Sequence, residues 1–226
     1  MPLIALEGID ASGKATQTQL LIDQLRARDL RAAALSFPRY GETVFGAMIA
    51  DYLNGKFGAL ATVAPQFAAL LFAGDRLESR GLITQLAAES HVVVFDRYVA
   101  SNLAHQAARV EVDQQRDFIA WLDQVEHGVY QLPRVDLTIL LDVPVMLAAQ
   151  MQITKRKRDY TDKPADLHEA DLSYLQATSD VYNLLAAEDH GGRWQRIACV
   201  DADGQLRDPA IISAEIWASV APFIEA

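Results

Sequence analysis

The feature that most constrains the fold is a short apolar run, Leu3–Glu7, that leads into Gly-x4-Gly-Lys between Gly8 and Lys14. A segment with helical periodicity, Thr16–Arg28, follows directly. Glycines allow the tight turn and the close backbone approach by which successive N–H groups point at one anion. The helix adds the partial positive charge of its N-terminus. The pattern therefore predicts a strand–loop–helix unit that binds the phosphates of a nucleotide.

Within this loop, Lys14 is expected to reach the β- and γ-phosphates and to neutralise charge that shifts during transfer. Ala15 departs from the pattern, because Ser or Thr at that position supplies a hydroxyl ligand to Mg²⁺. Three explanations stay open: water completes the metal's shell, carboxylates elsewhere hold the metal, or the chain binds nucleotide without catalysis. The predicted phosphate-binding residues are Gly8, Ala11, Ser12, Gly13, Lys14, Ala15 and Thr16.

Apolar, β-branched runs alternate with helical segments along the chain, which predicts an α/β fold with a parallel sheet wrapped by helices. No internal repeat, low-complexity tract or linker interrupts this alternation, so we expect a single domain over residues 1–226. Strands are expected at Leu3–Glu7, Ala32–Phe37, His91–Phe95, Val135–Asp142 and Arg196–Asp201. Helices are expected within Thr16–Arg28, Val63–Ala88 and Asp166–Ala187.

Composition excludes several other classes of protein. A net charge of −10 argues against broad electrostatic attraction to nucleic acid or to an anionic membrane. The lone Cys199 cannot form an intramolecular disulfide and fits a reducing compartment. No charged leader precedes the first apolar run, and no stretch reaches roughly 18 apolar residues. We therefore expect a cytoplasmic protein with no membrane and no nucleic-acid partner.

A second candidate site follows the expected strand His91–Phe95, where Asp96 and Arg97 come next. An Asp at the carboxyl end of a parallel strand beside a phosphate loop is placed to organise Mg²⁺. Arg97 offers a planar fork that suits a phosphate. The alternative role for Asp96 is to cap the next helix.

Four motifs follow one another along the chain in a definite order and spacing. They are Glu7-Gly-Ile-Asp10-x-x-Gly-Lys-x-Thr-Gln17, Phe37-Pro-Arg-Tyr40, Leu71-Phe72-x-x-Asp-Arg76 and Asp96-Arg97-Tyr98-x-x-Ser101-Asn102-x-Ala. Together they resemble the thymidylate kinase family, most closely its actinobacterial branch. The resemblance implies a P-loop nucleoside-monophosphate kinase fold, with a five-stranded parallel sheet flanked by helices, a short mobile lid at about 153–166, and a homodimer. It also implies transfer of the γ-phosphate of ATP to dTMP, giving dTDP and ADP.

The same resemblance implies a pocket for the acceptor nucleotide. Phe72 would stack on thymine, Arg76 would donate to a base carbonyl, Asn102 would read the pyrimidine edge, and Arg97 would hold the monophosphate. Without the flanking motifs, Phe72 at helical spacing would be read as ordinary core. The predicted substrate-binding residues are Asp10, Phe37, Pro38, Arg39, Tyr40, Phe72, Arg76, Arg97, Ser101, Asn102, His105 and His168.

A basic segment at 155–164 holds five basic and two acidic residues in an otherwise acidic chain. One group of the family carries a basic residue in the phosphate loop, whereas the other supplies arginines from the lid. Ala11 and Ser12 are neutral, so this chain resembles the second group, in which lid closure brings cations to the γ-phosphate. A solvated basic face is the alternative. The predicted ATP contacts from the lid are Arg156, Arg158 and Lys163, the predicted catalytic residues are Lys14, Asp10, Arg97 and Arg156, and the candidate Mg²⁺ ligands are Asp10, Asp96 and Glu169.

His105 and His168 stand where the family has tyrosines. We hypothesise a looser or pH-dependent discrimination between deoxyribose and ribose, because histidine is smaller and titrates near about pH 6.5. The alternative is that each histidine keeps a similar contact. Two other functions were weighed: a related kinase acting on dUMP or a nucleoside, and a nucleotide-binding sensor or switch GTPase. The chain has no Asn-Lys-x-Asp motif, which argues against the GTPase.

Overall fold

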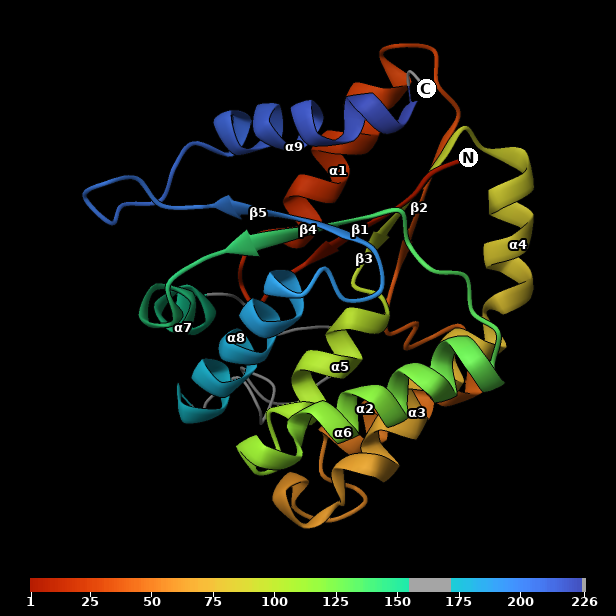
Figure 1. The fold of residues 1–226 in the computed structure, drawn as a ribbon, viewed down its shortest axis with the longest axis vertical. Coiled ribbons are helices and arrows are strands. Elements are labelled where there is room, and N and C mark those ends of the chain that lie inside the picture. The colour runs from red at the N-terminus through yellow and green to blue at the C-terminus, as the bar shows by residue number, and fades with distance from the viewer. Residues whose placement is uncertain (155–171, 225–226) are drawn as a thin grey trace.

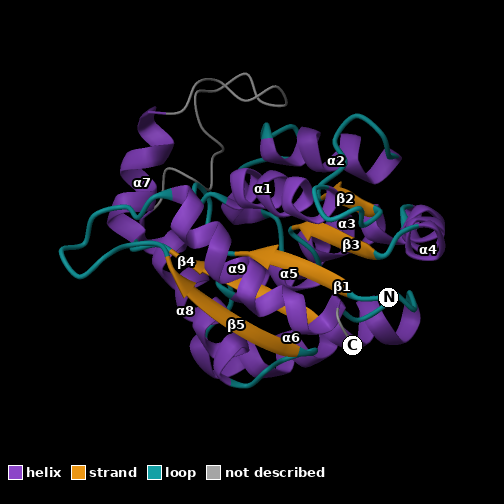
Figure 2. Ribbon diagram, turned by 90° about the horizontal axis from the view of Figure 1, so that it is seen from above, coloured by secondary structure: helices purple, strands orange, loops and turns teal. Residues whose placement is uncertain are grey.

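Five parallel strands form the central sheet in the part of the chain that the computed structural model describes, residues 1–154 and 172–224 (Figure 1). Their order across the sheet is β2-β3-β1-β4-β5, and Figure 2 shows them side by side with the twist usual for such sheets. The strands are β1 (Leu3–Glu7), β2 (Ala32–Ser36), β3 (Val92–Asp96), β4 (Leu137–Asp142) and β5 (Arg193–Ala198). This arrangement confirms the predicted parallel α/β fold.

Strand β1 occupies the middle of the sheet, and all five of its residues are buried. Its apolar side chains are covered on both faces, as expected for a strand in a parallel sheet. Leu6 of β1 lies opposite Asp96 of β3 and Ile139 of β4. The carboxyl ends of β1 and β3 are therefore level, and the loop that follows β1 emerges beside Asp96 and Arg97.

Helices cover both faces of the sheet. Helices α1 and α9 pack together on one face, while α5 and α8 pack together on the other (Figure 1). The α-helices are α1 (Lys14–Arg26), α2 (Val44–Leu53), α3 (Pro65–Glu78), α4 (Arg80–Glu89), α5 (Val99–Ala107), α6 (Gln115–Asp123), α7 (Val145–Thr154), α8 (Leu172–Ala187) and α9 (Pro209–Ile224). Two short 3₁₀ turns, η1 (Leu60–Thr62) and η2 (Val112–Gln114), and one π-helix, η3 (Gln124–Val129), complete the described elements.

Two expected elements differ from the structure by more than a shift of one or two residues at an end. The segment Val63–Ala88 forms two helices that meet at Ser79, whose backbone belongs to both ends. Strand β5 begins at Arg193, three residues before the expected Arg196. It lies at the edge of the sheet and exposes most of its side chains, so its start is hard to recognise in the sequence. An exposed edge strand lacks the apolar run that identifies a buried one.

Within the described ranges, no helix combines the length and the apolar character needed to cross a bilayer.

Candidate active site

The loop between β1 and α1 has the backbone that the glycine pattern predicts. Gly8 has φ +141°, and a Cβ there would lie 2.7 Å from the backbone oxygen of Leu141. Gly13, at φ +92°, caps the N-terminus of α1. Ala11 takes a left-handed conformation as well, with φ +64°. Such conformations turn successive backbone N–H groups toward one side, which is the geometry of an anion-binding nest.

Lys14 opens α1 and folds over this loop. Its Nζ donates to the backbone oxygens of Gly8 (2.9 Å) and Ile9 (2.8 Å). Burial and the charge of Arg97 lower the pKa of Lys14 to about 7, against the opposing attraction of nearby carboxylates such as Asp10. A buried cation whose charge is costly gains from an anionic ligand, so this position suits a polyphosphate. The adjacent Ala15 and Thr16 are exposed on the first turn of α1.

Arg97 links the phosphate loop to the neighbouring cavity. It follows β3 in a left-handed conformation, with φ +68°, and its backbone N–H donates to Leu6 O (3.1 Å). Its guanidinium forms an ion pair with Asp10 and donates to Ser101 Oγ (3.4 Å). Burial opposes the charge of Arg97, but Asp10 and the other acidic groups around it, Tyr182, Asp96 and Glu7, together outweigh burial and raise the pKa of the guanidinium. A strained residue held by such contacts is common at functional sites.

His105 joins the same network. Its Nε2 lies 3.2 Å from Arg97 Nη1, and its Nδ1 lies 3.0 Å from the hydroxyl of Tyr174. Arginine can only donate, so Nε2 must be the acceptor and the ring proton must sit on Nδ1. The Tyr174 hydroxyl then donates to the backbone oxygen of His105 (3.1 Å). This arrangement requires a neutral imidazole, because a protonated ring would oppose the Arg97 charge.

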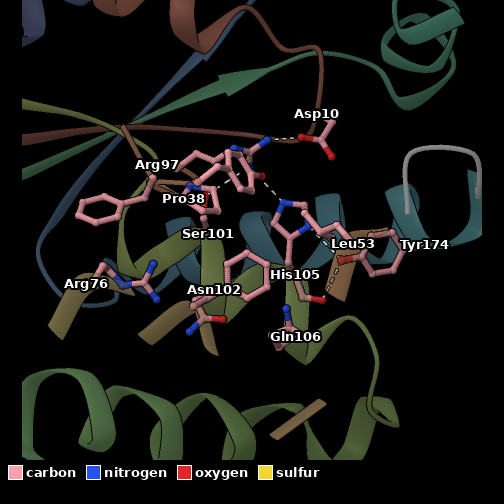
Figure 3. A pocket seen from close by; sticks show the side chains of 13 residues that line it. Asp10, Pro38, Leu53, Arg76, Arg97, Ser101, Asn102, His105, Gln106 and Tyr174 are labelled. Atoms are coloured by element: carbon pink, nitrogen blue, oxygen red, sulfur yellow. Dashed lines mark hydrogen bonds and ion pairs between the residues drawn. The ribbon is translucent and has the colours of Figure 1, made fainter. Parts of the chain in front are cut away.

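These side chains form one end of a cavity whose wall comes from the segments that follow β1, β2 and β3 and from helices α2, α3, α5 and α8 (Figure 3). The structure brings together every predicted substrate-binding residue except Arg39 and His168. Leu53, Gln106 and Tyr174 also line the cavity, although no motif identified them. The complete lining is Asp10, Phe37, Pro38, Tyr40, Leu53, Phe72, Arg76, Arg97, Ser101, Asn102, His105, Gln106 and Tyr174.

Arg39 is not among the residues that line this cavity. Its backbone N–H donates to Asp75 Oδ2 (2.9 Å), its Nη1 donates to Ser79 Oγ (3.0 Å), and its guanidinium also pairs with Glu42. The role predicted for Arg39 at the acceptor phosphate stays a prediction.

Two of the predicted base-reading residues share a partner that the sequence did not reveal. Arg76 and Asn102 both bond to the carboxylate of Glu126, which lies on η3 and is fully buried. Burial opposes the charge of Arg76, but the Glu126 carboxylate outweighs it and raises the pKa of Arg76. Ser101 is held elsewhere, because its hydroxyl donates to the buried carboxylate of Glu7 (2.6 Å).

Two carboxylates stand beside the phosphate loop, where a metal is expected. Asp10 lies in the loop itself, and Asp96 ends β3 in a half-buried position. Both act on the charge of Lys14, which places them close to it. The described residues contain no cluster of three or more His, Cys, Asp or Glu suited to a metal. Two carboxylates nevertheless fit Mg²⁺, which usually takes one or two of them and completes its shell with water and substrate phosphates.

The remaining predicted site residues lie outside the described part of the chain. They are Arg156, Arg158, Lys163, His168 and Glu169, together with most of the expected lid.

The parallel sheet, the phosphate loop at the end of its central strand and the adjoining polar cavity define a P-loop protein of the nucleoside-monophosphate kinase class. Residues 6–202 match the thymidylate kinase family. The chain belongs to the thymidylate kinase family.

Individual relatives agree with this assignment. The thymidylate kinase of Mycobacterium tuberculosis (strain ATCC 25618 / H37Rv) is 38% identical over 204 residues, which cover 90% of this chain and 94% of the relative. The thymidylate kinase of Afipia carboxidovorans is 29% identical over 95% of this chain and 86% of its own. The structure of thymidylate kinase from Candida albicans superposes with a TM-score of 0.72 at 22% identity, covering 98% of this chain and 91% of that one. This structural likeness supports the same fold.

Proposed function

We propose that this protein transfers the γ-phosphate of ATP to dTMP, giving dTDP and ADP. The observation that carries the proposal is the Asp10–Arg97 ion pair, which joins the phosphate loop to a cavity lined by Phe72 and Asn102. Donor and acceptor nucleotides bound on its two sides would have their phosphates next to each other, as in-line transfer requires. Membership of the thymidylate kinase family supports the identity of both substrates.

The chemistry needs positioning and charge rather than a covalent intermediate. Lys14 would neutralise the donor phosphates from the base of the loop, and Arg97 would orient the acceptor phosphate. The half-buried ring of Phe72 would stack on the base, while the polar side chains of Arg76 and Asn102 meet its edge. In this proposal the protein excludes water and holds the two nucleotides, and the acceptor's own phosphate oxygen attacks.

We also propose that Mg²⁺ accompanies ATP, with Asp96 and Asp10 as ligands in the described residues and Glu169 as a further candidate. When bound, the ion would neutralise charge that builds up on the transferred phosphoryl group. No other residue of α1 then has to supply the hydroxyl ligand that Ala15 lacks, since water and carboxylates provide the ligands.

The lid is part of the same proposal. Arg156, Arg158 and Lys163 would bring positive charge to the γ-phosphate, with Arg156 as the catalytic residue. The support is the neutral phosphate loop and the position of the basic segment directly after α7, which ends at Thr154.

A homodimer in the cytoplasm completes the proposal. Exposed apolar side chains on α2 and α3, namely Val44 (68%), Met48 (37%) and Phe67 (69%), are candidates for a subunit contact. The free, buried thiol of Cys199 suits a reducing compartment. Light scattering after size-exclusion chromatography tests the dimer, and a monomeric mass at micromolar concentration would count against it.

A coupled ADP-release assay with dTMP, dUMP, ribothymidine monophosphate and thymidine as acceptors tests the activity. We expect ADP release with dTMP and little with thymidine, because thymidine offers no phosphate for Arg97 to hold. Lys14→Met is the matched control, since it keeps the length of the side chain but removes its charge. No ADP above background with any acceptor would overturn the proposed function.

A further inference from the structure

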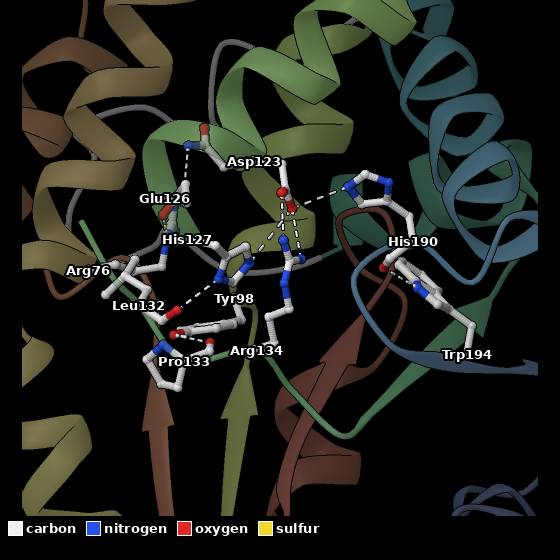
Figure 4. Close-up of polar contacts among 11 residues, drawn as sticks. Arg76, Tyr98, Asp123, Glu126, His127, Leu132, Pro133, Arg134, His190 and Trp194 are labelled. Atoms are coloured by element: carbon white, nitrogen blue, oxygen red, sulfur yellow. Dashed lines mark hydrogen bonds and ion pairs between the residues drawn. The ribbon is translucent and has the colours of Figure 1, made fainter. Parts of the chain in front are cut away.

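Glu126 is a fully buried carboxylate in the middle of the π-helix η3, with none of its surface exposed. It accepts a hydrogen bond from Arg76 Nε (2.8 Å), a second from Arg76 Nη2, and a third from Asn102 Nδ2 (2.8 Å). Figure 4 shows the carboxylate directed toward the guanidinium of Arg76. A buried charge is retained only when it is well paired, and Glu126 is paired with a cation and an amide at once.

These contacts settle which way the Asn102 amide points. Its Nδ2 donates to Glu126 and also to the backbone oxygen of Ala69 (3.0 Å). A carboxylate and a carbonyl both accept, so only the NH₂ group can face them. Asn102 Oδ1 is left over, and within the described residues this buried atom has no hydrogen-bond partner. Asn102 lines the cavity, so its unpaired acceptor is a candidate partner for a ligand N–H.

Arg76 is oriented by the same carboxylate. Its Nε and Nη2 are engaged by Glu126, and its side chain is only 2% exposed. No described residue accepts a hydrogen bond from its Nη1, although Arg76 lines the cavity beside Asn102 (Figure 3). Glu126 therefore leaves the cavity wall with one acceptor, Asn102 Oδ1, and one donor, Arg76 Nη1.

We propose that Glu126 is a positioning residue that sets the base specificity of this site. An acceptor next to a donor complements a ring N–H beside a carbonyl, which is the N3–H and O4 edge of thymine or uracil. Cytosine presents the reverse pattern, with a ring nitrogen that accepts and an amino group that donates. Its edge would set acceptor against acceptor at Asn102 and donor against donor at Arg76. This inference rests on the proposed function, which puts a pyrimidine in the cavity.

The Glu126→Gln variant separates this role from simple packing. Glutamine keeps the size of Glu126 but offers one carbonyl and one NH₂ group. In either orientation the new NH₂ group meets a donor. At the Oε2 position it faces Arg76 Nε, and at the Oε1 position it faces both Arg76 Nη2 and Asn102 Nδ2, so Arg76 or the Asn102 amide must turn. The site loses the order of donor and acceptor that favours thymine. Glu126→Asp retains the carboxylate and should keep the preference for thymine.

A matched control lies one turn away on the same segment. Asp123, the last residue of α6, forms a bidentate pair with Arg134 (3.0 and 2.7 Å; Figure 4), and among the described residues no hydrogen bond joins it to Arg76 or Asn102. Asp123→Asn makes the same change of carboxylate to amide next to η3. It should lower thermal stability without changing the choice of base.

The test is the ratio of kcat/KM for dTMP to that for dCMP, measured by ADP release in the wild type and the three variants. We expect Glu126→Gln to lower this ratio by about tenfold or more, while Glu126→Asp and Asp123→Asn leave it near the wild-type value. A fall in activity toward both acceptors with an unchanged ratio would overturn the inference and leave Glu126 a structural residue.

Calorimetric binding of thymidine and deoxycytidine keeps the inference separate from the kinase proposal. If the wild type transfers no phosphate but prefers thymidine, and Glu126→Gln loses that preference, the inference stands and the proposed function fails. If Glu126→Gln does not fold, side-chain NMR of the wild-type protein still tests the orientation of the Asn102 amide. The Asn102 NH₂ signals should keep their shifts when thymidine binds, and a large change would show that this group faces the base and would refute the proposed orientation.

Discussion

Breaking the Arg76–Glu126 ion pair from one side should destabilise the fold far more than removing both partners. The two side chains are 2% and 0% exposed, and Arg76 Nε lies 2.8 Å from Glu126 Oε2. Arg76→Met would leave a buried carboxylate with Asn102 as its one remaining donor among the described residues. Glu126→Leu would leave a buried guanidinium unpaired. Each change should cost about 3–5 kcal/mol of unfolding free energy, because an uncompensated charge stays in the interior.

The double variant Arg76→Met/Glu126→Leu removes both charges and replaces them with apolar side chains of similar size. Its remaining penalty is the Asn102 N–H that loses an acceptor, which costs about 1–3 kcal/mol. The two single effects added together would give about 6–10 kcal/mol. The coupling energy between the two positions should therefore be about 3 kcal/mol or more, with the double variant more stable than either single variant.

Equilibrium urea unfolding of the four proteins, followed by far-ultraviolet circular dichroism, measures this coupling. Arg116→Met is the matched control, because Arg116 pairs with Glu188 at the surface, where the side chains are 66% and 40% exposed. That change should cost less than about 1 kcal/mol. If the single effects of Arg76→Met and Glu126→Leu add to within about 0.5 kcal/mol, the two residues do not share a buried charge pair and the reasoning is wrong.

Three further predictions concern the cavity and the phosphate loop. The pKa of Lys14 is about 7 in the folded protein against 10.5 in the unfolded chain, so between about pH 7 and about pH 9 the unfolded chain binds more protons there. Stability should accordingly rise with pH by roughly 2 kcal/mol relative to Lys14→Met. Chemical denaturation at a series of pH values measures this, and an equal dependence of the unfolding free energy on pH in both proteins would contradict it. Phe72→Ala should raise the KM for dTMP by roughly tenfold through lost apolar contact, with a smaller effect on kcat, and an unchanged KM in steady-state assays would refute stacking. His105 accepts from Arg97 through Nε2, so His105→Phe should raise the KM for dTMP, whereas His105→Gln, which keeps an acceptor, should raise it less. Equal KM values for the two variants would exclude His105 as a support for Arg97.

Much of the fold and of the cavity could be predicted because the information is local. The apolar run of β1 and its glycine loop lie within Leu3–Lys14, and the observed strand has the expected bounds, Leu3–Glu7. Linked motifs predicted most of the cavity lining, because each motif lies at the carboxyl end of a strand or on a helix that faces it. Such residues meet whenever the parallel sheet forms.

The residues that were missed depend on contacts between distant segments. Glu126 is 50 residues from Arg76, and a single acidic residue in a helical stretch reads as a solvent-exposed position. Arg39 sits in a predicted motif, yet its backbone N–H donates to Asp75 and its Nη1 to Ser79, and the sequence alone does not pair it with either residue. Strand β5 was placed three residues late, because an edge strand with exposed Arg193 and Arg196 lacks a buried pattern.

The two ends of the cavity use the same chemistry with different burial, and this difference assigns them different roles. Each end holds an arginine in an ion pair with a carboxylate. At the phosphate end, Arg97 and Asp10 are 18% and 12% exposed, whereas at the base end Arg76 and Glu126 are 2% and 0% exposed. A partly hydrated pair can exchange partners at modest cost, so Arg97 can move hydrogen bonds from Asp10 to an incoming phosphate. A fully buried pair cannot, so Arg76 keeps Glu126 while it meets the base. The acceptor would then be fixed at its base and adjustable at its phosphate, which is the end that must approach the donor.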